Sequence, residues 1–156
     1  MPANKESLIE AIRNVQSEVE RLVESMPESA WAAPAYEAWN ARQLLCHVAS
    51  TSGVTGFLVN MARSPGSGGM GADFDQDAWN AEMVAVRQDR PLAEIVDEIR
   101  GILGRDIETV QSVPDKLLAG HFRAPWGREG PLSEVIIASI KGHLLDHLKD
   151  LQKVVA

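Results

Sequence analysis

Three histidines are the residues of this chain whose types and spacing best suit chemistry. His143 and His147 lie four positions apart in the segment GHLLDH, and His47 lies far earlier, in WNARQLLCHVA. Three neutral imidazoles with a fourth position left open are the ligands of a catalytic Zn²⁺-type site, and nickel or iron accepts the same ligands. The alternative is that each histidine is an ordinary core or boundary residue, because an i, i+4 pair also arises by chance.

Four long amphipathic helices are predicted to position these histidines. Apolar residues recur at helical spacing, and no alternating strand pattern competes with them. Asn40 and Gln43 can form a capping box at the start of the second helix, with Trp39 packing onto Leu44 as a hydrophobic staple. The predicted helices span residues 5–26, 40–63, 91–113 and 131 to nearly the C-terminus, bounded by Pro27, Pro91, Pro114 and Pro131. We therefore expect an all-α four-helix bundle.

The connection between the second and third helices decides whether the histidines meet. Residues 63–90 are long enough to return along the bundle, and they hold a short helical piece around DQDAWNAEMVAVRQ. Such a crossover gives an up-down-down-up bundle, in which the fourth helix is antiparallel to the second. His47 lies roughly 10 Å from the start of its helix, and His143 and His147 lie roughly 10–16 Å from the end of theirs. Antiparallel helices therefore bring all three to one level.

Length, charge and cysteine usage narrow the class of protein. The chain has 156 residues, which suits one domain over residues 1–156. The net charge of −7 disfavours a nucleic-acid surface. No apolar run approaches the length of a membrane span, and the N-terminus turns amphipathic at once, so we expect no membrane partner and a cytoplasmic location. The single cysteine, Cys46, fits a reducing compartment and is expected to be a packed small residue.

One glycine-rich string resembles a dinucleotide fingerprint. Gly66, Gly68 and Gly71 satisfy the spacing G-x-G-x-x-G. That fingerprint requires a preceding strand and a βαβ unit, whereas this string follows a predicted helix. We interpret it as a flexible loop.

The histidine segments resemble those of the DinB-like superfamily, which includes the N-terminal domain of mycothiol-dependent maleylpyruvate isomerases. WNARQLLCHVA is similar to the superfamily's Trp-centred second helix, whose first metal ligand corresponds to His47. GHLLDH is similar to the paired ligands of the last helix, which correspond to His143 and His147. The resemblance covers nearly the whole chain and implies an up-down-down-up bundle. The isomerase branch tends to have glutamate at the position of His143, so this set looks more like the thiol-transferase and uncharacterised branches.

The resemblance and the residues together leave two classes of function. The first is a metal-dependent enzyme that uses a divalent ion, zinc or nickel, and a low-molecular-weight thiol for S-transfer to, or isomerisation of, a small electrophile. Coordination deprotonates a thiol without the carboxylate base of an H-E-x-x-H hydrolase, and residues 144–146 are Leu, Leu and Asp. The second is a non-catalytic, stress-related helical binding module that forms a homodimer and that the metal only stabilises.

Several further residues are candidates for smaller roles. Asn80 is expected to contact substrate, because its segment resembles the Asn-bearing segment of family members before the third long helix. Asp146 and Asp150 flank the paired histidines and are possible acceptors for an imidazole N–H. The segment entering the third helix also carries Arg87. In the loop AGHFRAPWGREG, His121 is expected at the surface. Arg123, Trp126 and Arg128 of that loop are either a binding site for an anionic substrate or, as we expect, a packed tryptophan with solvated arginines.

Overall fold

The computed structural model describes residues 3–64 and 74–154. In chain order the elements are α1 (Lys5–Ser25), the 3₁₀ helix η1 (Glu28–Ala32), β1 (Pro34–Tyr36), β2 (Trp39–Asn40), α2 (Ala41–Thr51), α3 (Val54–Arg63), α4 (Gln76–Ala85), α5 (Leu92–Ser112), α6 (Asp115–Ala119), β3 (His121–Arg123), β4 (Glu129–Pro131), α7 (Leu132–Ser139), the π-helix η2 (Ile140–Leu145) and α8 (Asp146–Val154). The glycine string at Gly66, Gly68 and Gly71 lies outside the described residues.

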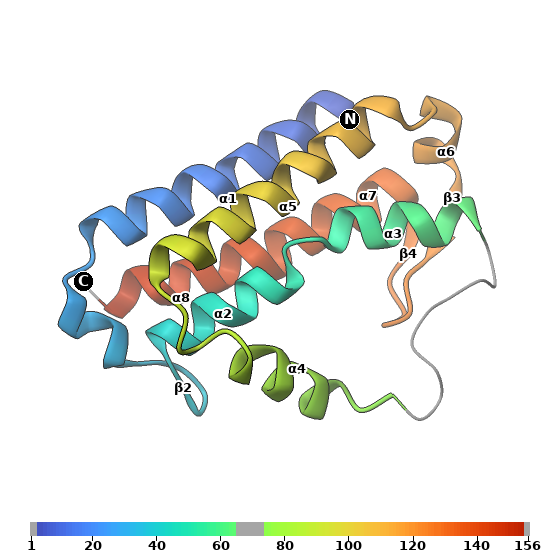
Figure 1. Cartoon of the computed structure of the whole chain (residues 1–156). Helices are drawn as coiled ribbons and strands as arrows, with labels where there is room; N and C mark the ends of the chain where they lie inside the picture. The colour runs from blue at the N-terminus through green and yellow to red at the C-terminus, as the bar shows by residue number, and fades with distance from the viewer. Residues whose placement is uncertain (1–2, 65–73, 155–156) are drawn as a thin grey trace.

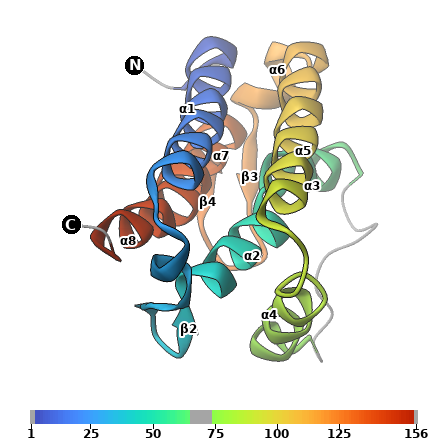
Figure 2. The same ribbon diagram turned by 60° about the vertical axis from the view of Figure 1, so that its left-hand side comes forward.

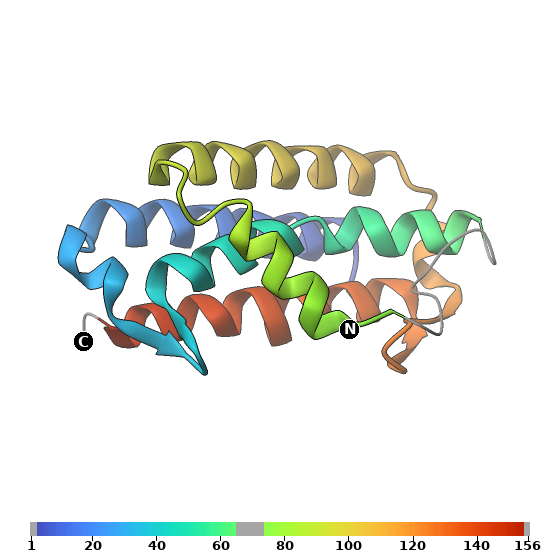
Figure 3. The same ribbon diagram turned by 60° about the horizontal axis from the view of Figure 1, so that its bottom comes forward.

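The long helices form a four-helix bundle with the predicted up-down-down-up order. In Figure 1, α1 runs from right to left, α2 with α3 returns to the right, α5 runs in that same direction, and α7 with α8 runs back to the left. Seen turned by 60°, α1, α5, α2 and α7 occupy the four corners of the bundle (Figure 2). The crossover before α5 contains α4, which lies across the outside of α2 (Figure 3). The second helix and the last one are therefore antiparallel, as the depth of the histidines requires.

Local sequence signals explain where the helices begin. Asn4 caps α1, and its side chain exchanges hydrogen bonds with Ser7 in a capping box. The predicted capping box of the second helix is confirmed, since Asn40 Oδ1 accepts from the Gln43 backbone at 2.8 Å and Gln43 Oε1 accepts from the Asn40 backbone at 3.0 Å. The helices α5 and α7 begin directly after Pro91 and Pro131, within a residue of the predicted starts.

Two predicted helices are not continuous. The helix expected over residues 40–63 is broken at Ser52 and Gly53, so α3 leaves α2 at an angle that Figure 1 shows. The Ser52 hydroxyl donates to the Val48 carbonyl at 2.6 Å, which draws the chain out of regular helix geometry. The fourth helix contains the π-helical turn η2, which holds one extra residue within the turn. Apolar periodicity did not reveal either break, because both halves keep an apolar face.

Two short antiparallel hairpins were not predicted. Strand β1 pairs with β2 before α2, and β3 pairs with β4 before α7, with Arg123 opposite Glu129. Strands of two or three residues leave no alternating pattern for the sequence to show. The tight turn of the second hairpin is made by Gly127, whose φ of 98° suits glycine. The first hairpin packs against α8 and the second against α7, so the two lie at opposite ends of the last helix.

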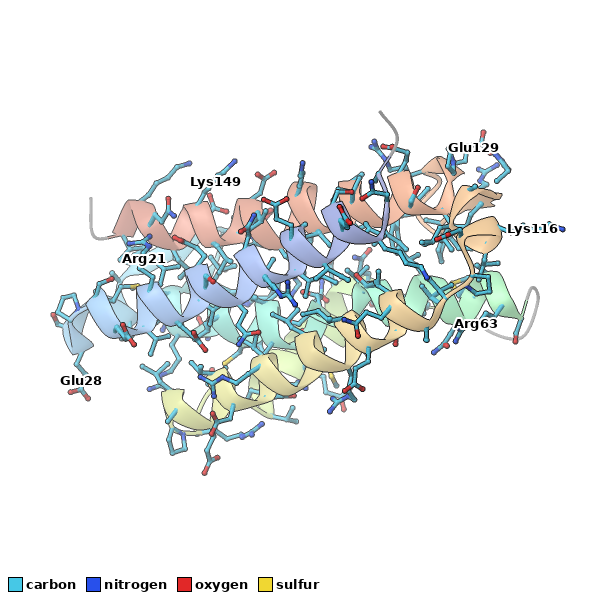
Figure 4. All side chains as sticks on the ribbon, turned by 90° about the horizontal axis from the view of Figure 1, so that it is seen from above. Arg21, Glu28, Arg63, Lys116, Glu129 and Lys149 are labelled. Carbon is cyan, nitrogen blue, oxygen red and sulfur yellow. The ribbon has the colours of Figure 1, made fainter. Side chains whose placement is uncertain are left out.

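The core is a continuous layer of aliphatic side chains between the four helices. Leu44, Ile99 and Ile136 are essentially inaccessible to solvent, whereas charged side chains such as Lys149, Glu129 and Lys116 project outward (Figure 4). The stretch Ala41–Arg63 is long and apolar enough to cross a membrane by length and composition alone. In the bundle 56% of its most apolar window is buried, as in a core helix, and it is divided between α2 and α3.

Candidate metal centre and cleft

The three histidines come from two antiparallel parts of the bundle. His47 lies on α2, His143 within η2 and His147 at the start of α8. His47 and His147 lie on helix faces that also carry buried core residues. His47 follows the capped start of α2 on the face of Leu44, and His147 lies on the same face as the buried Leu144 and Leu151. His47 and His147 therefore both face the interior of the bundle.

The three imidazoles converge on one point. The ring centroid of His47 lies 5.1 Å from that of His143 and 5.1 Å from that of His147, and the other two centroids are 4.7 Å apart. One ring nitrogen from each histidine lies within 4.8 Å of the others. A single ion with bonds of about 2 Å can contact all three after small side-chain movements. The geometry thus matches the expectation that antiparallel helices bring the histidines to one level.

Burial keeps His47 and His143 neutral. His47 and His147 are buried, with 4% and 8% of their surfaces exposed, and His143 is partly buried. Burial, reinforced by the neighbouring histidines, lowers the pKa of His47 to about 4. Burial and His147 likewise lower the pKa of His143 to about 4, although the Asp146 carboxylate opposes the shift. At neutral pH the lone pairs of these two rings are therefore available to a metal without competition from protons.

Unpaired nitrogens support the fit of a metal. Among the described residues, Nδ1 of His47 and Nδ1 of His147 are buried without a hydrogen-bond partner. Asp150 Oδ2 approaches Nδ1 of His147 at 3.5 Å but does not form a hydrogen bond with it. Buried polar atoms without partners are costly, and a ligand that accepts their lone pairs removes that cost. The donor set of three imidazoles fits a divalent transition metal.

A threonine hydroxyl orients one of the imidazoles. Thr51 Oγ1 donates to the carbonyl of His47 at 2.9 Å and lies 3.3 Å from Nε2 of His143. Because the hydroxyl hydrogen goes to the carbonyl, the oxygen is placed to accept from Nε2–H of His143, which leaves Nδ1 of that ring with its lone pair. Thr51 is four residues after His47, on the same face of α2, so helical spacing already marked it as a neighbour.

The first hairpin closes one side of the histidine cluster. The ring of Trp39 lies 4.8 Å from that of His47, and the ring of Tyr36 meets that of His147 edge-on at 4.7 Å. The Glu37 carboxylate raises the pKa of Tyr36, so the ring faces His147 as a neutral phenol. Trp39 was predicted only as a hydrophobic staple and Tyr36 was not predicted at all, because neither strand gives a sequence signal.

The opposite side of the cluster opens into a cleft of about 750 Å³. His47 and His143 contribute to its wall, and His147 does not. The other walls come from α2 and α3, from the start of α4, from α7 with η2, and from the turn of the second hairpin. Aromatic residues line much of it, together with the amides and hydroxyls of Gln76, Asn80, Ser50 and Ser139. A ligand in this cleft can reach the histidines directly.

The other predicted residues divide between the cleft and the scaffold. Asn80, Trp126 and Arg128 line the cleft. His121 and Arg123 instead line a second cleft of about 670 Å³, and exposed His121 lies 3.4 Å from Glu129. Arg123 therefore does not share the surroundings of Arg128, although both belong to the second hairpin.

The remaining candidate residues, Arg87, Asp146 and Cys46, do not line the cleft. Arg87 donates to the carboxylate of Glu98, with an Nη2–Oε2 distance of 2.8 Å. Asp146 is exposed and pairs with Lys149 at 3.6 Å. Cys46 is fully buried, and burial raises the pKa of its thiol to about 11, which makes it a packed residue rather than a nucleophile. Phe57 and Trp79, which also line the cleft, were missed because their helix faces resemble ordinary core faces.

The protein is thus an all-α bundle with up-down-down-up order. Its second and last helices together hold a cluster of three histidines. The family model of the DinB superfamily matches residues 11–150, and the chain belongs to that superfamily. No curated protein resembles the chain closely enough in sequence to count as a relative.

Two solved structures show the same fold at low sequence identity. One is YfiT from Bacillus subtilis, described as a probable metal-dependent hydrolase with an unusual four-helix bundle topology. It is 16% identical with a TM-score of 0.75, covering 96% of this chain and 85% of YfiT. The other is the mycothiol-dependent maleylpyruvate isomerase, which is 17% identical with a TM-score of 0.74 over 94% of this chain. This chain spans 60% of the isomerase.

Proposed function

We propose that the protein is a metal-dependent enzyme that joins a low-molecular-weight thiol to a small electrophile, or isomerises the electrophile through such an adduct. His47, His143 and His147 would hold one divalent ion, zinc or nickel. The observation that carries the proposal is the convergence of the three imidazoles at the inner end of an open cleft. A purely stabilising metal site would need no such opening, so the cleft favours an enzyme over the non-catalytic module.

The composition of the cleft favours thiol chemistry over hydrolysis. A bound divalent ion lowers the pKa of a thiol or of water at an open coordination position. No aspartate or glutamate is among the described residues that line the cleft, so the carboxylate base of an H-E-x-x-H hydrolase has no counterpart among them. A thiolate needs no such base. Its sulfur attacks the electrophilic carbon and forms a C–S bond. A haloaromatic substrate then loses halide with its electron pair. An unsaturated substrate either takes up a proton at the neighbouring carbon or, in an isomerisation, expels the thiolate again.

The chain's own residues would orient the reactants. The hydroxyl of Thr51 holds the ring of His143, and Trp39 and Tyr36 exclude water from the closed side of the cluster. Asn80 lines the cleft from α4 and would contact the substrate there. The proposed partners are thus a thiol and an electrophile, and we extend the proposal to a cytoplasmic location, where such thiols are kept reduced.

Metal analysis tests the first half of the proposal. Protein purified without a histidine tag should contain about one equivalent of zinc or nickel after reconstitution, and His47→Ala should lose it. His121→Ala is the matched control, because His121 is exposed and lies outside the cluster. Absence of bound metal in the reconstituted unsubstituted protein would contradict the proposed site.

Activity measurements test the second half. Metal-loaded protein should consume haloaromatic or unsaturated electrophiles when mycothiol, bacillithiol or glutathione is present, and His47→Ala should reduce the rate to that of the uncatalysed reaction. His121→Ala should retain the rate. Metal-dependent hydrolysis in the absence of thiol would show instead that the protein acts as its neighbour YfiT is described, as a hydrolase.

A further inference from the structure

The cleft beside the histidines has an aromatic wall that the proposed chemistry does not by itself require. Phe57 on α3, Phe74 and Trp79 at α4, and Trp126 in the second hairpin all line it. Phe57, Phe74 and Trp126 are 38%, 38% and 48% exposed, and the rings of Phe74 and Trp79 lie 6.3 Å apart. Large aromatic side chains gathered from three separate elements around one opening are typical of a surface that binds a flat apolar group.

Among the described residues that line the cleft, one side chain carries a permanent charge, and that charge is positive. Arg128 is the only lysine, arginine, aspartate or glutamate among the described residues that line it. The chain as a whole has a net charge of −7, so a lone cation here differs from the average surface. Within residues 3–64 and 74–154, Arg128 forms no ion pair, whereas Arg87 and Arg100 are paired with Glu98 and Glu20. The guanidinium of Arg128 is thus available to an anionic ligand.

Hydroxyl groups on α2 and α7 make the helix side of the cleft unfavourable for an anionic group. The hydroxyl of Ser50 donates to the carbonyl of His47 at 2.8 Å, and that of Thr51 donates to the same carbonyl at 2.9 Å. Ser139 Oγ donates to the carbonyl of Val135 at 2.9 Å. With their hydrogens already used, these hydroxyls offer a ligand only acceptor lone pairs, which repel a carboxylate. In the metal-free chain an anionic group is therefore directed towards Arg128 on the hairpin side and away from these hydroxyls.

We propose that the electrophile of this site is an aromatic molecule that bears a single anionic group. The ring lies on the aromatic wall, its carboxylate or sulfonate binds Arg128, and its uncharged reacting carbon faces the histidines. This inference names the substrate class of the proposed thiol-dependent reaction and rests on that function. The volume of about 750 Å³ is within the range of small-molecule sites and leaves room for the thiol beside the ring.

Binding of a matched pair of probes tests the inference without any reaction. The probes are 2-naphthoate and its neutral counterpart 2-naphthamide, titrated by calorimetry into the full chain without metal or thiol. We expect 2-naphthoate to bind about tenfold more tightly, which corresponds to about 1.4 kcal/mol. Arg128→Gln should remove that difference and leave 2-naphthamide binding unchanged. Arg123→Gln is the matched control from the same hairpin and should leave both affinities unchanged, because Arg123 lines the other cleft.

A second variant tests the aromatic wall. Trp126→Ala should weaken both probes by a similar factor, about fivefold or more, since it removes stacking area without changing charge. Equal affinity for the two probes, failure of both to bind, or a loss caused equally by Arg123→Gln would overturn the inference.

The outcomes separate this inference from the proposed function. Charge-selective binding that depends on Arg128, together with an absence of thiol-dependent turnover, would refute the reaction and leave the ligand class standing. Thiol-dependent turnover that is equally fast for anionic and neutral aromatic electrophiles, after correction for their uncatalysed rates, would refute the ligand class and leave the reaction standing.

Discussion

At the scale of single residues, the cluster depends on partners that hold each imidazole in place. His147 meets Tyr36, His47 meets Trp39, and His143 is close to Thr51. Removing a partner that fixes the orientation of a metal-binding imidazole commonly lowers the metal affinity by about 10- to 100-fold. Thr51 is the most easily tested of them, because valine has the same shape without the hydroxyl.

Thr51→Val should lower zinc affinity by roughly tenfold while the protein stays folded. The substitution removes the oxygen that lies 3.3 Å from Nε2 of His143. Ser50→Ala is the control, because the Ser50 hydroxyl also donates to the His47 carbonyl, whereas within the described structure it is Thr51 that lies beside Nε2 of His143. Affinities can be measured by competition with a chromophoric chelator. Equal affinities for the two variants would show that Thr51 does not orient the ring.

At the scale of elements, the break between α2 and α3 is supported from across the bundle. The start of α3 has no side-chain cap of its own, and the backbone N–H of Gly56 donates to the carboxylate of Asp106 on α5. Asp106 is 5% exposed, and its Oδ2 is buried without a partner among the described residues. A carboxylate from another helix thus takes the place of a local N-cap, and it holds α3, which carries Phe57, beside the cleft.

The close approach at Gly56 predicts a sharp difference between two glycines. A Cβ at Gly56 would lie 2.8 Å from Oδ1 of Asp106, so Gly56→Ala should destabilise the protein by about 1–3 kcal/mol. Gly104→Ala on α5 is the control, because nothing lies within 4 Å of its added Cβ. That variant should gain up to about 1 kcal/mol from better helix propensity. Urea unfolding of both variants is the measurement, and equal effects would contradict the packing described.

The buried carboxylate also predicts a pH dependence of stability. Burial raises the pKa of Asp106 from 3.8 to about 6, although the Gly56 hydrogen bond opposes the shift. Between those two pH values the folded protein binds more protons than the unfolded chain. The contribution of the Asp106 carboxyl group to the free energy of unfolding is therefore complete below pH 3.8 and is lost as the pH rises through 6.

Asp106→Asn should remove that pH dependence. The stability of the unsubstituted protein relative to Asp106→Asn should fall by about 2–3 kcal/mol at most between pH 4 and pH 7. Urea unfolding of metal-free protein across this range measures the difference, and because the histidines are present in both proteins their titration cancels. A difference that does not change with pH would contradict the raised pKa.

At the scale of the whole molecule, the histidine cluster joins two segments that are distant in sequence. An ion held by His47 on α2 and by the pair on η2 and α8 would bind the folded chain and not the unfolded one. Such binding stabilises the fold by about 2.7 kcal/mol when the free metal is 100 times its dissociation constant.

We therefore expect zinc or nickel to raise the melting temperature by roughly 5–10 °C in one cooperative transition. His121→Ala should show the same rise, since His121 is not part of the cluster. His47→Ala should show little or none. Differential scanning calorimetry with and without chelator makes the comparison, and an equal rise in His47→Ala would place the metal elsewhere.

Features that depend on residues close together in the chain could be predicted from the sequence alone. The capping box of Asn40 and Gln43, the helices that carry His47 and His147, and the starts of α5 and α7 directly after proline all follow from local spacing. The length of the crossover also predicted the antiparallel order of the second and last helices, and with it the meeting of the three histidines. Periodicity and capping are properties of neighbouring residues, so one sequence suffices to show them.

Features that depend on contacts between distant segments became visible only in the folded chain. Arg128 and Arg123 look alike in sequence, but the second hairpin assigns them to different clefts. The bond from Gly56 to Asp106 joins residues from two helices, and no pattern within either helix indicates it. The aromatic wall of the cleft likewise comes from α3, α4 and a hairpin turn. Which side chains face a shared space is set by how the elements pack, because packing brings together residues that local spacing cannot relate.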